Sequence, residues 1–163
     1  QIGTARLAKV GNDISIIANS YSVVESLIAA RFLQEHKGIS TEVIDMRSIS
    51  PWDKETIFKS VSKTKRVAFV DTGHISFGTS GEIITSVVEE FWGELISKPI
   101  RIGFPDLPVP SAPGLSANYY PGPLGIATAI ADTFGLRLND EEKQFLIGTG
   151  PSDIPPQGLI GPF

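Results

Sequence analysis

A glycine-rich segment between a predicted strand and a predicted helix is the first place in this sequence to look for chemistry. It spans residues 73–81 and reads GHISFGTSG. Open α/β sheets bind ligands where a strand leads into a helix, because the first helical amides point toward an anion. The segment matches neither a dinucleotide fingerprint nor a P-loop, since no Lys-Ser/Thr pair follows its glycines. It is either a purely structural turn or a weak anion-binding loop. The candidate contacts are Gly73, His74, Gly78, Thr79, Ser80 and Gly81.

A hydrolytic triad is a second chemical possibility, built from Asp71, His74 and either Ser76 or Ser80. No G-x-S-x-G motif marks an activated serine, so an ordinary loop histidine is the alternative. The chain has two histidines and no cysteine, which gives no metal-binding motif. Of the carboxylates near predicted strand and helix ends, Asp53 suits a helix start. We therefore predict no catalytic and no metal-binding residue.

A proline-rich segment differs in kind from the rest of the chain. Residues 104–121 read FPDLPVPSAPGLSANYYP, and their five prolines exclude a central strand or helix. A pre-ordered segment that displays aromatic side chains suits contact with another subunit, because little entropy is lost on docking. The alternative is a rigid crossing that ties the last helix to the sheet. The candidate interface residues are Phe104, Asp106, Pro108, Pro110, Tyr119, Tyr120 and Pro121.

Alternating strand and helix signals must position these segments. We expect strands at 4–10, 14–18, 42–46, 66–70 and 99–102, and helices at 22–36, from 51 onward, at 82–95 and at 122–134. Capping signals mark three helix starts, namely Ser22 with Glu25, Ser50-Pro51, and Thr79 with Glu82. Strands that alternate with helices predict a three-layer α/β/α domain with a mainly parallel sheet.

Composition limits the function classes. The chain has 163 residues, 41% of them hydrophobic and 20% charged, as in an ordinary globular domain. A net charge of −4 argues against nucleic acid as the main partner. No apolar run is long enough to span a bilayer. We expect one domain over 1–136, and a Gly/Pro-rich tail over 137–163 that has no core of its own and lies on the surface or stays mobile.

Residues 2–134 resemble the transketolase C-terminal domain found in the β subunit of thiamine-diphosphate 2-oxoacid dehydrogenases (pyruvate and branched-chain). The resemblance rests on IGTARLAKVGNDISIIA, SLIAARFLQEHKGISTEVIDMRSISPWD, SVSKTKRVAFVD, the glycine loop with GEI, and PDLPVPSAPGLSANYYP. The PxPSAPxL portion favours the dehydrogenase over transketolase or deoxyxylulose-phosphate synthase, which share the fold. The sequence departs from the pattern at Ser116, where those β subunits usually carry a glutamate.

The resemblance implies a domain that assembles an enzyme rather than one that catalyses alone. In such enzymes two other domains hold thiamine diphosphate and magnesium, and the GDG signature of one of them is absent from this sequence. We therefore expect no cofactor bound by this chain, which starts without Met and reads as a fragment of a longer protein. The implied partners are the other subunits of the dehydrogenase and the peripheral-subunit-binding domain of the acyltransferase core. The implied location is the cytoplasm, or the mitochondrial matrix in a eukaryote.

Three hypotheses follow. The first is a C-terminal assembly domain of a 2-oxoacid dehydrogenase β subunit, with transketolase and deoxyxylulose-phosphate synthase as related alternatives. The second is a stand-alone regulatory module that binds an anionic ligand at the glycine loop. The third is an independent hydrolase that uses His74.

Overall fold

The two most apolar segments of the chain form the centre of the sheet. The computed structural model describes residues 2–112, 116 and 119–147. Strand β2 (Ile14–Ala18) is buried throughout, and β4 (Val67–His74) is buried over its first five residues. Continuous apolar runs of this kind suit strands that are covered on both faces.

The sheet has five strands in the order β1-β3-β2-β4-β5. Strands β3 (Thr41–Asp45) and β5 (Ile100–Phe104) are parallel to their neighbours β2 and β4, whereas β1 (Arg6–Lys9) runs antiparallel to β3. The chain leaves β2 toward β3 on one side and returns to β4 on the other. The strand order therefore reverses between β2 and β4, and ligands of open α/β sheets bind beside the carboxyl ends of such strands.

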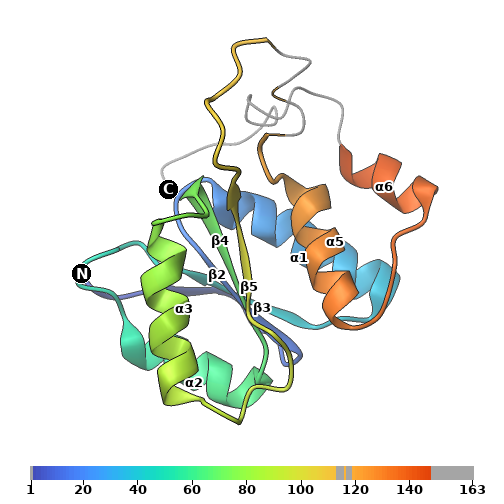
Figure 1. The fold of residues 1–163 in the computed structure, drawn as a ribbon. Helices are drawn as coiled ribbons and strands as arrows, with labels where there is room; N and C mark the ends of the chain where they lie inside the picture. The colour runs from blue at the N-terminus through green and yellow to red at the C-terminus, as the bar shows by residue number, and fades with distance from the viewer. Residues whose placement is uncertain (1, 113–115, 117–118, 148–163) are drawn as a thin grey trace.

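Helices cover both faces of this sheet (Figure 1). Helices α1 (Ser22–Lys37) and α5 (Pro123–Thr133) pack against one face, and α2 (Lys54–Thr64) and α3 (Thr79–Glu90) against the other. Successive residues of β2 alternate between the two cores, because Ile16 joins the α1 side and Ile17 joins the α2 side. The three-layer, mainly parallel α/β/α prediction is confirmed.

The helix at 22 starts where predicted, but the N-caps expected from local signals were wrong at all three helices. Helix α2 begins after Asp53, whose carboxylate accepts hydrogen bonds from the Thr56 amide at 3.0 Å and from the Ala5 amide at 2.9 Å. Asp53 therefore caps the helix and also anchors the chain before β1. This confirms the helix-start role predicted for Asp53 and displaces the start predicted at Ser50-Pro51.

Neither predicted capping box forms. The N-cap of α1 is Tyr21, and the Ser22 hydroxyl donates to the Asn19 and Val70 carbonyls instead. The N-cap of α3 is Gly78, which lies one residue before Thr79. Helix α3 then ends at Glu90 rather than 95, three residues before Gly93 adopts φ +80°. At α1, the bond from Ser22 to the Val70 carbonyl of β4 therefore overrides the local pattern.

The segment after residue 136 contributes more than the sequence predicted. A further helix, α6 (Asp140–Ile147), lies beside α5, and Leu138 and Leu146 are buried in the core on the α1 side. Lys37 of α1 and Glu142 of α6 form an ion pair at 2.8 Å. These residues join the main core and do not form one of their own, and the domain division at 136 stays a prediction. Among the described residues, no helix has the length and apolar character needed to cross a bilayer.

Candidate functional site

The structure brings the two candidate segments together at one end of the sheet. The glycine loop leaves β4 at this end, and the proline-rich segment leaves β5 beside it. Nδ1 of His74 donates to the Pro105 carbonyl at 2.9 Å, and the Ile75 amide donates to the Phe104 carbonyl at 3.0 Å. The Ser76 hydroxyl also donates to the Asp106 carboxylate. Two segments that the sequence presents separately therefore form a single surface.

The glycine loop is a tightly closed turn. Gly78 approaches the loop backbone so closely that a Cβ atom there would lie 2.2 Å from the His74 carbonyl oxygen. Phe77, the residue before it, has φ +57°, which is unusual for a bulky side chain. Below the loop, Asp71 is 6% exposed, and its carboxylate accepts a hydrogen bond from Nδ2 of the Asn19 side chain at 3.0 Å. The turn is thus built around Gly78 and supported by a buried polar pair.

The triad that the sequence allowed is not assembled in the structure. Asp71 is bonded to Asn19, and His74 is bonded to a backbone carbonyl. Ser76 is bonded to Asp106, and Ser80 is 1% exposed in the first turn of α3. Among the described residues, no hydrogen bond links an aspartate to His74 or His74 to a serine. The geometry therefore gives the hydrolase hypothesis no support.

The electrostatics of the glycine loop are mixed. The loop opens helix α3, whose first-turn residues include Thr79, Ser80 and Gly81, so the positive end of the helix dipole lies here. The Asp71 carboxylate lies against Gly73 and Gly78, the Asp106 carboxylate accepts from Ser76, and Glu82 stands in the first turn of α3. These acidic groups oppose an anion at this position. Within the described part of the chain, no three His, Cys, Asp or Glu side chains gather to hold a metal ion. The anion-loop assignment stays a prediction.

The aromatic residues of the proline-rich segment pack on one another. The ring centroid of Phe104 lies 5.3 Å from that of Tyr119 and 5.1 Å from that of Tyr120. Tyr119 is only 5% exposed, and its hydroxyl donates to the Leu107 carbonyl at 3.1 Å. These contacts tie residues 104–107 to the start of α5. For Tyr119 the structure therefore favours the rigid crossing over a displayed interface aromatic.

Three other apolar side chains of this region are exposed to solvent. Phe77, Leu107 and Val109 are exposed by 108%, 62% and 59%, respectively. The first two line a shallow hollow of about 520 Å³ together with His74, Ser76, Asp106 and Pro108. We call the exposed part of this region the proline-loop surface; it comprises His74, Ser76, Phe77, Asp106, Leu107, Pro108 and Val109. Of the remaining interface candidates, Pro110 and Pro121 are half-buried.

The sequence predictions omitted the three exposed apolar residues of the proline-loop surface. Leu107 and Val109 alternate with Pro108 and Pro110, so they cannot join a strand that would bury them. That alternation was a usable signal for exposure. Phe77 carried no such signal, because its exposure follows from the left-handed backbone before Gly78. Contiguous exposed apolar patches of this kind commonly mark interaction sites.

The Tyr119 hydroxyl allows a test of the crossing. Tyr119→Phe keeps the aromatic packing and removes the hydrogen bond to the Leu107 carbonyl, which leaves that carbonyl to water. We expect a loss of about 1 kcal/mol in the free energy of unfolding, measured by urea denaturation. Tyr120→Phe is the matched control, for which we expect less than about 0.5 kcal/mol. Equal losses in the two variants would contradict the tether.

Comparison with known proteins places the chain beside one family. The model of the transketolase C-terminal domain matches residues 3–134. The pyruvate dehydrogenase E1 component subunit beta (mitochondrial) of Pisum sativum is 44% identical over 120 residues, which cover 74% of this chain and 33% of that protein. The Mycoplasma pneumoniae subunit is 43% identical over 113 residues, covering 69% and 34%. The mitochondrial Saccharomyces cerevisiae subunit is 36% identical over 133 residues, covering 81% and 36%.

A solved structure has the same fold. A chain described as "Split gene transketolase, inactive beta4 tetramer" superposes with a TM-score of 0.71 at 25% identity, and the match covers 85% of this chain and 44% of that one. The present chain spans about a third of the length of the curated relatives it matches.

Proposed function

Because this chain belongs to the transketolase C-terminal domain family, we propose that it is the assembly domain of a thiamine-diphosphate-dependent 2-oxoacid dehydrogenase β subunit. The proline-loop surface is the observation that carries this proposal. It exposes three apolar side chains, and a tight turn and an aromatic cluster hold the backbone that presents them. Such a surface is already ordered before it docks, so association costs little entropy.

The parent reaction in this proposal is oxidative decarboxylation of a 2-oxoacid with acyl transfer to lipoyl groups. Thiamine diphosphate and magnesium belong to other domains of that enzyme, and this chain alone does not catalyse the reaction. The sequence has no GDG signature, and its described residues gather no metal-binding carboxylates. These residues therefore do not suit the cofactor.

The partners in this proposal are other subunits of the same enzyme, which meet the proline-loop surface. A finer proposal is that the domain also docks the peripheral-subunit-binding domain of the acyltransferase core. We place the enzyme in the cytoplasm of a bacterium or the mitochondrial matrix of a eukaryote, in line with the mitochondrial names of the plant and yeast relatives. The related alternative is a transketolase or deoxyxylulose-phosphate synthase, which the PxPSAPxL segment disfavours.

Subunit association provides the test. Phe77→Ser in the β subunit that contains this chain should weaken its association with the partner subunits at least tenfold, or about 1.4 kcal/mol. The reason is that the variant loses apolar area that is free for a partner to bury, since none of the described residues covers Phe77. Sedimentation velocity over a range of subunit concentrations measures the change.

An exposed aromatic residue elsewhere supplies the matched control. Trp92 is 82% exposed just after the end of α3, at the opposite end of that helix from the glycine loop (Figure 1). Trp92→Ser should leave association unchanged. Wild-type association in the Phe77→Ser variant would exclude the proline-loop surface as the assembly contact.

A regulatory anion-binding module is the second candidate function. The position of the glycine loop beside β4, where the strand order reverses, favours it. Inorganic phosphate or a nucleotide at 100 times its Kd would stabilise the fold by about 2.7 kcal/mol. Thermal-shift measurements that show no stabilisation by either ligand at millimolar concentration would eliminate this candidate.

A further inference from the structure

The outer edge of β5 is open. Among the described residues, strand β5 ends the sheet order and pairs with β4 alone. In Figure 1 this edge lies between α3 and α5, and none of the described helices or strands crosses it. An uncovered edge presents unpaired N–H and C=O groups and is a template for another strand unless something blocks it.

The backbone bonds of β5 show which groups face outward. The Phe104 carbonyl accepts from the Ile75 amide, so Phe104 directs its backbone groups toward β4. Because backbone directions alternate along a strand, Ile102 also faces β4, and Arg101 and Gly103 face outward. Pro99, just before the strand, falls in the outward register and lacks an N–H group, and Pro105, just after the strand, also lacks one. The open edge is therefore short, with two free N–H groups between two prolines.

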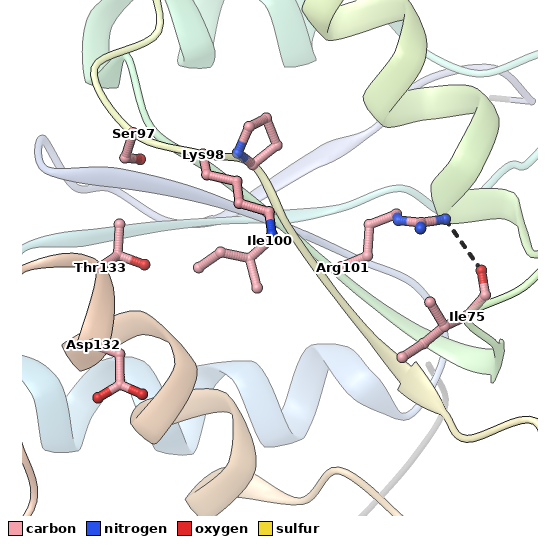
Figure 2. Close-up of a pocket in the computed structure, with 8 residues that line it drawn as sticks. Ile75, Ser97, Lys98, Ile100, Arg101, Asp132 and Thr133 are labelled. Atoms are coloured by element: carbon pink, nitrogen blue, oxygen red, sulfur yellow. Dashed lines mark hydrogen bonds between the residues drawn. The ribbon is translucent and has the colours of Figure 1, made fainter.

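A hollow of about 520 Å³ lies in front of this edge. Figure 2 shows Ile75 and the Arg101 side chain on the α3 side of the hollow, and Asp132 and Thr133 of α5 on the other. Lys98 lies along the strand between them. When extended peptides add a strand to a sheet, they bind where an edge strand forms the floor of a groove beside a helix.

The charge in the groove selects the peptide. Lys98 and Arg101 are exposed there and face the single carboxylate of Asp132, so the groove is locally positive on a chain whose net charge is −4. Nη1 of Arg101 donates to the Ile75 carbonyl at 3.2 Å, which fixes the side chain at the groove wall and leaves its other donors available. The Ser97 hydroxyl is buried at the groove and has no hydrogen-bond partner among the described residues.

We propose that the β5 edge binds an extended acidic peptide by strand addition. The peptide backbone bonds to the backbone N–H groups of Arg101 and Gly103, and the peptide carboxylates pair with the side chains of Lys98 and Arg101. This interaction is independent of the proline-loop surface. A second copy of the chain fits less well, because antiparallel pairing of two β5 edges would place a second Lys98 and Arg101 along the same short edge, and like charges repel.

Binding to a labelled peptide tests the proposal on the full chain. The probe is a nonapeptide of alternating Glu and Thr, capped at both ends and carrying fluorescein, and fluorescence anisotropy measures its Kd. Two control peptides have Lys in place of Glu, or a methyl group on every backbone nitrogen. We expect the acidic probe to bind, the basic peptide to bind at least tenfold more weakly, and the methylated peptide not to bind.

Variants of the protein test the two cations. Arg101→Glu and Lys98→Glu should each raise the Kd of the probe at least tenfold, while Lys54→Glu on α2 should leave that Kd unchanged.

Amide hydrogen exchange locates the contact. Saturation with the acidic probe should slow exchange of the Arg101 and Gly103 amides at least tenfold, because both N–H groups become bonded. Equal binding of the methylated peptide, protection at other amides only, or no binding below about 1 mM would each overturn the proposal. Protection of the same amides by self-association without any peptide would also overturn it, in favour of a second copy.

Discussion

Replacing Gly78 by alanine is expected to lower the free energy of unfolding by about 3 kcal/mol. A Cβ at this position would lie 2.2 Å from the His74 carbonyl oxygen and 3.5 Å from a carboxylate oxygen of Asp71. The first contact is with backbone at the end of β4, so it cannot be relieved by a change of rotamer. Either the glycine loop opens or the end of the strand moves, and both changes disturb the proline-loop surface. Urea denaturation followed by circular dichroism measures the loss.

Gly81→Ala is the matched control, three residues further along. A Cβ there would have the flexible end of Arg101 as its nearest neighbour, at 3.8 Å. Gly81 lies in the first turn of α3, where alanine is the better helix former, so we expect no loss and a gain of up to about 1 kcal/mol. If the two variants lost the same stability, the close approach at Gly78 would not be what shapes the loop.

The fold was predictable from the sequence because its strongest signals are local. Continuous apolar runs predict β2 and β4 as buried strands, and Gly38 predicts the end of α1. Each of these signals lies within a few residues of sequence. The helix caps were not predictable in the same way. Ser22 has good capping chemistry, yet its hydroxyl bonds to the Val70 carbonyl across the strand ends. A local pattern cannot indicate that a distant carbonyl competes for the same hydroxyl.

Helix α6 shows the opposite case, because a local signal in the sequence marks its start. The Asn139 side chain accepts from the Glu142 amide at 2.9 Å, and the Glu142 carboxylate accepts from the Asn139 amide at 2.8 Å. This reciprocal pair is a capping box, and it precedes the apolar residues Phe145 to Ile147. The glycines and prolines further along obscured it when the whole tail was judged by composition.

The candidate site was predictable in its parts but not as a whole. Both the glycine loop and the proline-rich segment stand out by residue type, yet their pairing depends on β5 lying beside β4. Strand order in a parallel sheet is a long-range property, which one sequence does not determine. Joining the two segments through His74 and Pro105 therefore required the structure.

Glu25→Gln is expected to stabilise the protein at pH 8 and to have little effect at pH 4.5. Burial raises the pKa of the Glu25 carboxyl from 4.5 to about 7. Between these values the folded state holds a proton that the unfolded state releases, so wild-type stability falls as the pH rises and levels off above pH 7. A neutral glutamine removes that loss.

The full pKa shift of Glu25 corresponds to about 3.4 kcal/mol. The positive end of α5 favours the ionised form, because Glu25 lies beside the α5 cap residue Gly122. We therefore expect about 2 kcal/mol.

The measurement is urea denaturation of both proteins at pH 4.5 and pH 8. Burial, and secondarily the Glu25 charge, raise the pKa of the neighbouring Tyr21 hydroxyl from 10.0, so Tyr21 stays neutral over this range and does not contribute. Glu35→Gln is the control on the same helix, since Glu35 is exposed and its replacement should change stability by less than about 0.5 kcal/mol at either pH. If Glu25→Gln were equally stabilising at both pH values, proton uptake at Glu25 would not be the cause. A steeper fall of stability with pH in the variant would mean that Glu25 is more stable as a carboxylate in the folded protein. The seam between α1 and α5, where the proline-rich segment ends, is thus expected to be tightest when Glu25 is protonated.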